Sequence, residues 1–455
     1  MRQEPVSPIH GAQTAAGKPD AIDAAAAADT RLLQEVAEQA LAAMRAQGFD
    51  AAQVTASRTA QDEVNISHNE ASLLRSTEVC RLKLLGLIDG RKASTELSEF
   101  EIDAIRRRIA GLHADALSAP QDDANAVSSG QHARLVQGPQ QGDLGLLADK
   151  AGELLAFRAR ETPRMMVDEG AALHARTDAH TLTTGGSDLA CSVGWYALQA
   201  FGTAREGKQS SSFNYAGGTA DDLRGQDASA FFGLADMLRD TERQIHTRPV
   251  GANFIGDVVL MPNAAANLVQ WLLAQIGDIQ LIAGSSLYRE RVGDVIASPL
   301  LALCSRFDAP GSAALSSDAF VTPPVEILRD GRLVTLTPSL YGSRKTGIAH
   351  VPTAAGGWDV DAGATSLGDL VGGVARGALV GRLSMGNPAA NGDFSGVIKN
   401  SFAIADGSIG SALSETMISG NIGRMLRDVV AVSRERIDTG ALRLPWLRVA
   451  NLHFS

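Results

Sequence analysis

Apolar residues recur along the chain at two different spacings, and segments of the two kinds alternate. Helical spacing, with apolar side chains every three or four positions, occurs over residues 29–47, 98–112 and 144–160. Between and after these segments, short runs alternate apolar with polar residues, which is typical of strands. The pattern therefore predicts an α+β fold.

Asp-Gly pairs punctuate the predicted strands. They occur at Asp89-Gly90, Asp330-Gly331 and Asp406-Gly407. Asp-Gly favours the tight turn of a β-hairpin, because both residues tolerate positive φ. Residues 210–223 (SSSFNYAGGTADDL) are predicted as a polar, glycine-containing loop.

Changes in pattern and polarity divide the chain. Residues 1–28 are predicted as a flexible lead-in, and 29–117 as a smaller N-terminal domain of helices on an antiparallel sheet. Residues 118–142 are polar and rich in Gln, Asp and Ser, so we predict a linker. Residues 143–455 are predicted as a larger, strand-rich C-terminal domain.

One stretch, Val258–Asp278, predicts a buried strand that leads into a helix from Asn263 to Gly277. This helix contains no His, Cys, Asp or Glu before its end. Gln270 and Gln275 lie five residues apart, which corresponds to about 140° around a helix. Neutral amides are poor zinc ligands, so we interpret this as a core helix with solvated or hydrogen-bonded amides.

Composition narrows the function. The 455 residues carry a net charge of −10, which disfavours a nucleic-acid-binding surface. No apolar run reaches the roughly 18 residues of a membrane span, and no signal peptide is evident. Three well-separated cysteines favour reduced, buried thiols and a cytoplasmic location.

No common catalytic motif is present. His174 and His180, the closest pair of histidines, would lie about 20 Å apart on one strand, too far to share a metal. Asp393 and Glu415 sit among small residues, where a carboxylate could bind a peptide amine or backbone N–H groups. The favoured alternative is structural: Asp393 caps a turn, and Glu415 pairs with a nearby arginine such as Arg424.

Several segments, taken in their order, resemble one known family. They are NISHNEASLLRSTEVCRLKLLGLIDGRKASTELSEFEIDAIRRRIA, VVLMPNAAANLVQWLLAQIGD, GSSLYRERVGDVIASPLLALCSRFDAPGS, ILRDGRLVTLTPSLYGSRKTG, GNPAANGDFSGVIKN, ETMISGNIGRML and LRLPWLRVANLHF. The resemblance is to the TldD/PmbA family, and within it to the PmbA (TldE) branch. It covers nearly the whole chain after the lead-in.

The resemblance implies a cytosolic assembly in which a TldD-type subunit binds zinc and a TldE-type subunit does not. The pair acts as a peptidase on unfolded or small peptides, including ribosomally made precursors. The zinc subunit uses HExxxH on the helix described above, together with a Cys near the C-terminus. Here the motif positions are Gln270, Trp271 and Gln275, and no Cys follows Cys304. No cofactor is expected in this chain, and zinc is expected in the partner.

Two further segments depart from the family pattern. An Asp-x-Glu-Gly turn is reduced to Asp318, and a Ser-Arg-Gly stretch is reduced to Ser395-Gly396. If those segments touch substrate or partner, this protein is tuned to a different peptide.

The first hypothesis is a zinc-free subunit that pairs with a TldD-like chain and helps to hold an extended peptide, without a nucleic-acid or membrane partner. Its candidate peptide- or partner-binding residues are Gly386, Asn387, Asp393, Ser395, Glu415 and Asn421. The second is a peptide-binding or escort module with no peptidase role. The third is catalysis by Asp393, Ser395 or Glu415 themselves, although the sequence shows no base beside Ser395.

Overall fold

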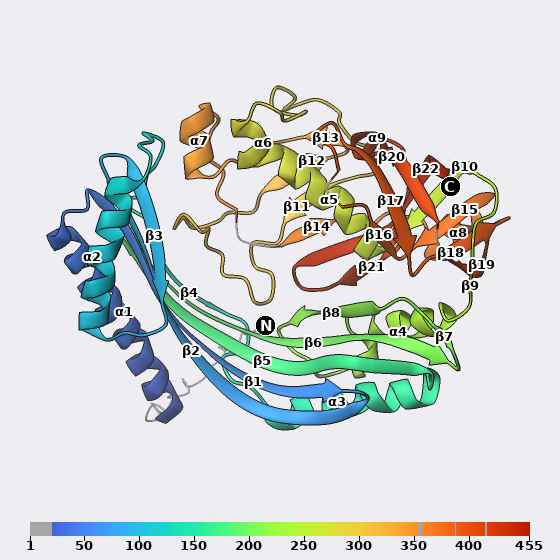
Figure 1. Cartoon of the computed structure of the whole chain (residues 1–455), viewed down its shortest axis with the longest axis horizontal. Helices are drawn as coiled ribbons and strands as arrows, with labels where there is room; N and C mark the ends of the chain where they lie inside the picture. Colours follow the sequence, from blue (N-terminus) through green and yellow to red (C-terminus); the bar gives the residue numbers. More distant parts are fainter. Residues whose placement is uncertain (1–20, 354–356, 387, 415) are drawn as a thin grey trace, which may run out of the picture.

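The computed structural model describes residues 21–353, 357–386, 388–414 and 416–455 (Figure 1). Residues 1–20 of the predicted lead-in lie outside the described residues. The rest of that segment is not a lead-in, because the first helix already begins at Ala21. The alanine run from Ala24 to Ala28 explains this, since alanine has the highest helix propensity.

The first sheet consists mainly of long antiparallel strands that curve across the molecule (Figure 1). Its order is β3-β2-β1-β5-β6-β4, and β7 and β8 also pair with β6. Among the described strands of this sheet, only β4 pairs in parallel, with β6. The strands are β1 (Ala51–Ser67), β2 (Glu70–Ile88), β3 (Arg91–Leu97), β4 (His132–Gln137), β5 (Met165–Thr183), β6 (Asp188–Glu206), β7 (Gln209–Ser210) and β8 (Asn214–Ala220).

Helices pack on this sheet and bury two apolar cores. They are α1 (Ala21–Gln47), α2 (Ile102–Ser118), α3 (Leu144–Glu161) and α4 (Leu234–Arg243), with a short 3₁₀ turn at Ala228–Ala230. α1 and α2 share one core with β1 and β2, and α3 and α4 share another with β5 and β6. Figure 1 shows α1, α2 and α3 on the outer side of the curved sheet and the second sheet on its inner side.

The first sheet extends across the predicted linker. β4 lies inside residues 118–142, and β5 pairs with β1 from Gln53↔Thr183 to Ser67↔Glu169. The strands of residues 165–220 therefore belong with the N-terminal sheet and not with the C-terminal one. A local pattern predicts a strand but not its distant partner, which explains the difference. The helix predicted from Ser98 begins at Ile102, because Glu101 accepts from the N–H groups of Asp103 and Ala104 as its cap.

The second sheet is mixed. Its main order is β13-β12-β11-β14-β22-β10-β15-β18-β19-β9, and β16, β17, β20 and β21 join it off this path. Its strands are β9 (Thr247–Arg248), β10 (Phe254–Leu260), β11 (Leu303–Ser305), β12 (Glu326–Arg329), β13 (Arg332–Leu333), β14 (Trp358–Val360), β15 (Arg376–Val380), β16 (Arg382–Ser384), β17 (Asp393–Lys399), β18 (Phe402–Ala405), β19 (Ser408–Leu413), β20 (Met417–Asn421), β21 (Val429–Asp438) and β22 (Leu442–Phe454).

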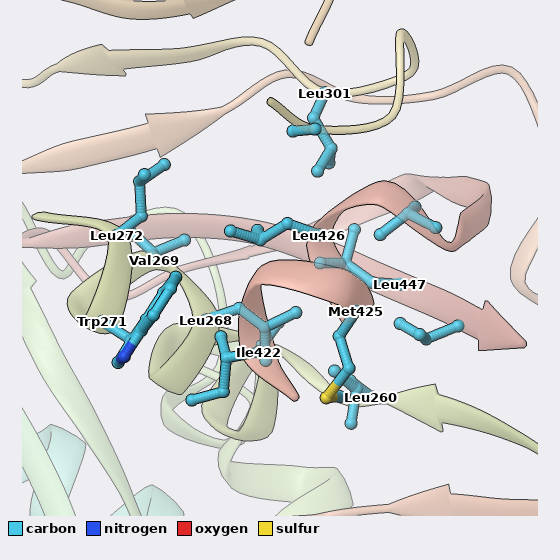
Figure 2. Packing of buried hydrophobic residues seen from close by; sticks show 14 of the residues in the cluster. Leu260, Leu268, Val269, Trp271, Leu272, Leu301, Ile422, Met425, Leu426 and Leu447 are labelled. Atoms are coloured by element: carbon cyan, nitrogen blue, oxygen red, sulfur yellow. The ribbon is translucent and has the colours of Figure 1, made fainter. Parts of the chain in front are cut away.

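The helices of this part are α5 (Pro262–Ile276), α6 (Asp278–Ile282), α7 (Leu340–Thr346), α8 (Leu367–Gly372) and α9 (Ile422–Arg427). α5 and α9 pack together with β22 in the largest core, where Leu260, Leu268, Ile422 and Met425 meet (Figure 2). No helix in the described part of the chain is long and apolar enough to span a membrane.

The predicted Asp-Gly turns are confirmed. Each Asp and each Gly of the three pairs has positive φ: 48° and 70° at Asp89-Gly90, 47° and 72° at Asp330-Gly331, and 47° and 73° at Asp406-Gly407. Each pair joins two antiparallel neighbours. The predicted α+β class is also confirmed, with a helix-covered N-terminal sheet and a larger strand-rich C-terminal sheet.

Candidate functional site

Helix α5 positions the residues on which the sequence hypothesis rests. Strand β10 enters the helix directly, and Pro262 occupies the first helical position, where a missing N–H costs nothing. The observed bounds agree with the predicted helix to within one residue. Leu268, Leu272 and Ile276 are at most 1 % exposed, so the core fixes the rotation of the helix.

Gln275 is buried and acts as a clamp between two segments. Its Nε2 donates to the carbonyl oxygen of Ala390 at 3.1 Å, and its Oε1 accepts from the N–H of Leu287 at 3.0 Å. The side chain is 2 % exposed. Both ends of the amide are therefore used, and the hydrogen-bonded alternative of the sequence interpretation is the observed one.

Trp271 fills the space beside Gln275. Its indole packs edge-on against the Tyr288 ring at a centroid distance of 6.0 Å, and burial raises the pKa of Tyr288. Gly392 has φ +91°, and a Cβ there would come within 2.9 Å of the indole. A Cβ at Gly423 would be 3.4 Å from the neighbouring carbon of the same six-membered ring. Two glycines thus let the backbone approach the six-membered ring of the indole closely. The position of Trp271 is seen in Figure 2.

These three positions do not fit a zinc ion. Gln270 is exposed, the Trp271 indole offers no lone pair for a metal, and both polar ends of Gln275 are already bonded. In the described residues, no group of three or more His, Cys, Asp or Glu side chains is placed to hold a metal.

Asp393 and Asn421 form a polar cluster beside the helix. They are register partners at the ends of β17 and β20. Asn421 Nδ2 donates to Asp393 Oδ1 at 2.8 Å, and Asn391 Nδ2 donates to Asp393 Oδ2 at 2.8 Å. These two amides lower the pKa of the exposed Asp393 carboxyl, so it remains ionised at neutral pH.

Asn421 also begins helix α9. Its Oδ1 accepts from the backbone N–H of Arg424 at 3.0 Å, as an N-cap residue does. Its Nδ2 additionally donates to the Asn391 carbonyl oxygen at 2.8 Å. The cluster thus holds the loop before β17 against the start of α9, and this local role accounts for the polar contacts of both residues.

The other candidate residues are arranged less closely. Ser395 lies two residues along β17 from Asp393, is exposed on the same face, and faces Ser419 of β20. Gly386 has φ +58°, and a Cβ added there would meet no atom within 4 Å. Asn387 and Glu415 lie outside the described residues. A role of these residues in binding a peptide or a partner stays a prediction.

His174 and His180 each make a local polar contact. His174 Nε2 lies 2.9 Å from the Pro139 carbonyl oxygen, and His180 Nε2 lies 2.7 Å from Asp188 Oδ1. The two histidines therefore have separate partners and do not contact a common group. Cys191 and Cys304 are half-buried thiols, and burial raises the pKa of both, that of Cys191 to about 11.

A cavity that the sequence patterns do not predict lies on the inner face of the first sheet. This concave-face cavity measures about 860 Å³ and crosses β2, β1, β5, β6 and β8. Small residues such as Gly170, Ala197 and Gly217 line it, and Phe201 and Tyr215 border it with 38 % and 48 % exposure. The run of small residues AGGTA in the sequence could have indicated this cavity. It lies in strand β8, so the prediction of a loop over residues 210–223 was wrong for this part.

One family model matches the C-terminal part of the chain. Residues 255–455 match the model of the PmbA/TldA metallopeptidase C-terminal domain. A search among curated proteins finds no match. This confirms, for the C-terminal part, the resemblance seen in the sequence.

Solved structures share the fold of almost the whole chain. TldE from Thermococcus kodakarensis has 18 % identity and a TM-score of 0.78, covering 92 % of this chain and 100 % of that one. A putative modulator of DNA gyrase from Bacteroides thetaiotaomicron has 20 % identity and a TM-score of 0.79, covering 93 % and 98 %. A second such modulator, from Thermotoga maritima, has 16 % identity and a TM-score of 0.73, covering 93 % and 100 %. At these identities the likeness concerns the fold.

Proposed function

With residues 255–455 belonging to the PmbA/TldA metallopeptidase C-terminal domains, we propose that the chain is the zinc-free subunit of a two-part metallopeptidase. The complex degrades or processes unfolded or small peptides, of which a ribosomally made natural-product precursor is one kind. A TldD-like subunit supplies the zinc. This chain completes the chamber and helps to hold an extended peptide, which sheets bind through main-chain hydrogen bonds.

The observation that carries the proposal is the packing at Trp271 and Gln275. Where the resemblance puts a catalytic Glu and a ligand His in the zinc subunit, this chain has a buried indole and a doubly bonded amide. A hydrolytic zinc site needs about three ligands and an open coordination position. In this proposal the helix of this chain has a structural role, and the partner subunit binds the zinc and carries out hydrolysis.

Peptide digestion by each subunit alone and by the mixture tests this proposal. We expect the chain alone to release no fragments from an unfolded peptide, and the mixture to do so until a zinc chelator is added. Zinc bound stoichiometrically by this chain alone, together with cleavage by it, would overturn the proposal.

The second candidate function is a peptide-binding or escort module without a peptidase role. The concave-face cavity favours it, because this cavity is lined by residues of one chain and needs no partner to form. Peptide binding by the isolated chain, without any association with an HExxxH-bearing relative, would support this alternative.

Catalysis by residues of this chain is the third hypothesis. Asp393 is tied to two amides that keep it ionised, which suits a structural carboxylate better than a general acid. Replacing Asp393, Ser395 and Glu415 with Ala, one at a time in the assembled complex, tests the idea. A residue whose replacement leaves the rate unchanged is removed from consideration.

A further inference from the structure

A second pocket lies where the two sheets of the molecule meet. This junction pocket measures about 320 Å³. β8 and α4 form one side, and the first residues of α5 together with strands of the second sheet form the other. Gln244 Nε2 donates to the Ser401 carbonyl oxygen at 2.7 Å and fastens the two parts. Along the axis of α5, Asn263 at the pocket lies about 10 Å from Gln270, so the pocket is separate from the HExxxH positions.

The walls of the junction pocket are mainly apolar. Phe232 and Met237 come from the first part of the chain, and Leu379 and Trp446 come from the second; all four are at most 9 % exposed. Phe232 has φ 55°, which is rare for a bulky residue and is retained only where the surroundings impose it. The volume lies at the low end of the range of about 300–1,000 Å³ for ligand pockets, so it suits one ring-sized group.

The charged side chains that line the pocket form two ion pairs on α4, and in one of them Arg239 lies 3.9 Å from Asp236. Asp240 and Arg243 form an ion pair at 3.1 Å on the α4 wall, and the Arg243 guanidinium lies 4.0 Å from the Phe402 ring centroid. Burial raises the pKa of Asp240 to about 6. A charged ligand group would have to break this pair or lose its hydration, whereas an uncharged apolar group would not.

The junction pocket adjoins the concave-face cavity. Tyr215 and Ala216 of β8 line both. The Arg382 guanidinium lies 4.3 Å from the Phe213 ring centroid and 5.4 Å from that of Tyr215, which holds these rings beside the shared border. A chain lying along the concave face therefore passes the entrance of the pocket.

We propose that the junction pocket takes one large, uncharged apolar side chain, aromatic or branched, of an extended peptide that lies on the concave face. This inference rests on the proposed peptide-holding function and names the feature of the peptide that this chain selects. The pocket gives an anchor for a single side chain, while the small residues of the sheet leave room for the peptide backbone.

Methionine-methyl NMR of the full chain, without any partner, tests the anchor. Met237 and Met261 line the pocket, and their signals are assigned through M237L and M261L. Titration with N-acetylphenylalaninamide is expected to shift both signals and to leave the signal of Met44, a fully buried residue of α1, unchanged. N-acetylalaninamide should bind at least about tenfold more weakly, given the apolar area of a large side chain. Absence of any shift at Met237 and Met261 would overturn the proposal.

Two variants locate the binding. Ile409 lines the pocket and is 39 % exposed, so I409W is expected to fill the entrance and abolish the shifts. Val430, a strand residue with 50 % exposure away from the pocket, gives the matched control V430W, which should bind as the unmodified chain does. Equal loss in both variants, or in neither, would contradict the assignment. This binding test uses the chain without a zinc subunit. Failure of the probe to bind would therefore contradict the pocket assignment, whereas absence of peptidase activity in the mixture would contradict the proposed function.

Discussion

Replacing Gln275 with Leu removes the clamp on helix α5 at nearly constant side-chain volume. The change deletes the bond from Nε2 to the Ala390 carbonyl oxygen and the bond from the Leu287 N–H to Oε1. Each such bond contributes about 0.5–1.5 kcal/mol net, so the variant should lose about 1–3 kcal/mol in its free energy of unfolding. Local opening should become easier mainly in the two segments that the amide joins, which contain Leu287 and Ala390.

Denaturant titration and amide hydrogen exchange measure this effect. The midpoint of unfolding should fall, and exchange should accelerate in residues 285–289 and 388–392. Gln270→Leu is the matched control, because Gln270 lies on the same helix and is exposed. It should change the stability by less than about 0.5 kcal/mol. If Gln275→Leu proves as neutral as Gln270→Leu, the structural role assigned to this amide is refuted.

Three further outcomes are expected. Gly392→Ala should lower the thermal midpoint, because φ is +91° and the new Cβ would meet the Trp271 indole at 2.9 Å; a midpoint equal to that of the unmodified chain would contradict the packing. Asn421→Ala should cost about 1 kcal/mol in unfolding free energy through loss of the α9 cap, and denaturant titration would show it. Asp240 has a folded pKa near 6 against 3.8 when unfolded, so its carboxyl binds more protons in the folded state, and its contribution to stability should fall by up to about 3 kcal/mol as pH rises from 4 to 6. Asp240→Asn should flatten that slope in thermal melts across this range, and an unchanged slope would exclude Asp240 as its source.

Local chemistry made parts of this structure predictable. Helix α5 was predicted to within one residue, because Pro262, an unbroken apolar face and Gly277 mark its start, its interior and its end. The three Asp-Gly turns followed from the need for positive φ at both positions. These features depend on residues that are close together in the sequence.

Features that depend on distant residues were not predictable. β5 completes the first sheet by pairing with β1, which lies more than a hundred residues earlier. β8 was mistaken for a loop because Gly217 and Gly218 suggested a turn. A Cβ at Gly218 would come within 2.6 Å of the Thr439 carbonyl oxygen, so the glycine is required by a close approach that only the fold reveals.

In the candidate site, too, the residue types were predictable from the sequence and their contacts were not. The absence of HExxxH was evident from Gln270, Trp271 and Gln275, but the sequence could not say what these residues do instead. The partners of Gln275 are Ala390, 115 residues away, and Leu287, 12 residues away. Similarly, the bond between Asp393 and Asn421 spans 28 residues and two strands.

The central claim is that this chain serves as the zinc-free member of a pair. Co-expression with the host's HExxxH-bearing relative, followed by native mass measurement and metal analysis of the purified complex and of each chain, tests it most directly. We expect a stable heteromer that contains zinc only in the other chain. Zinc bound by this chain itself, or no association between the two chains, would contradict the account.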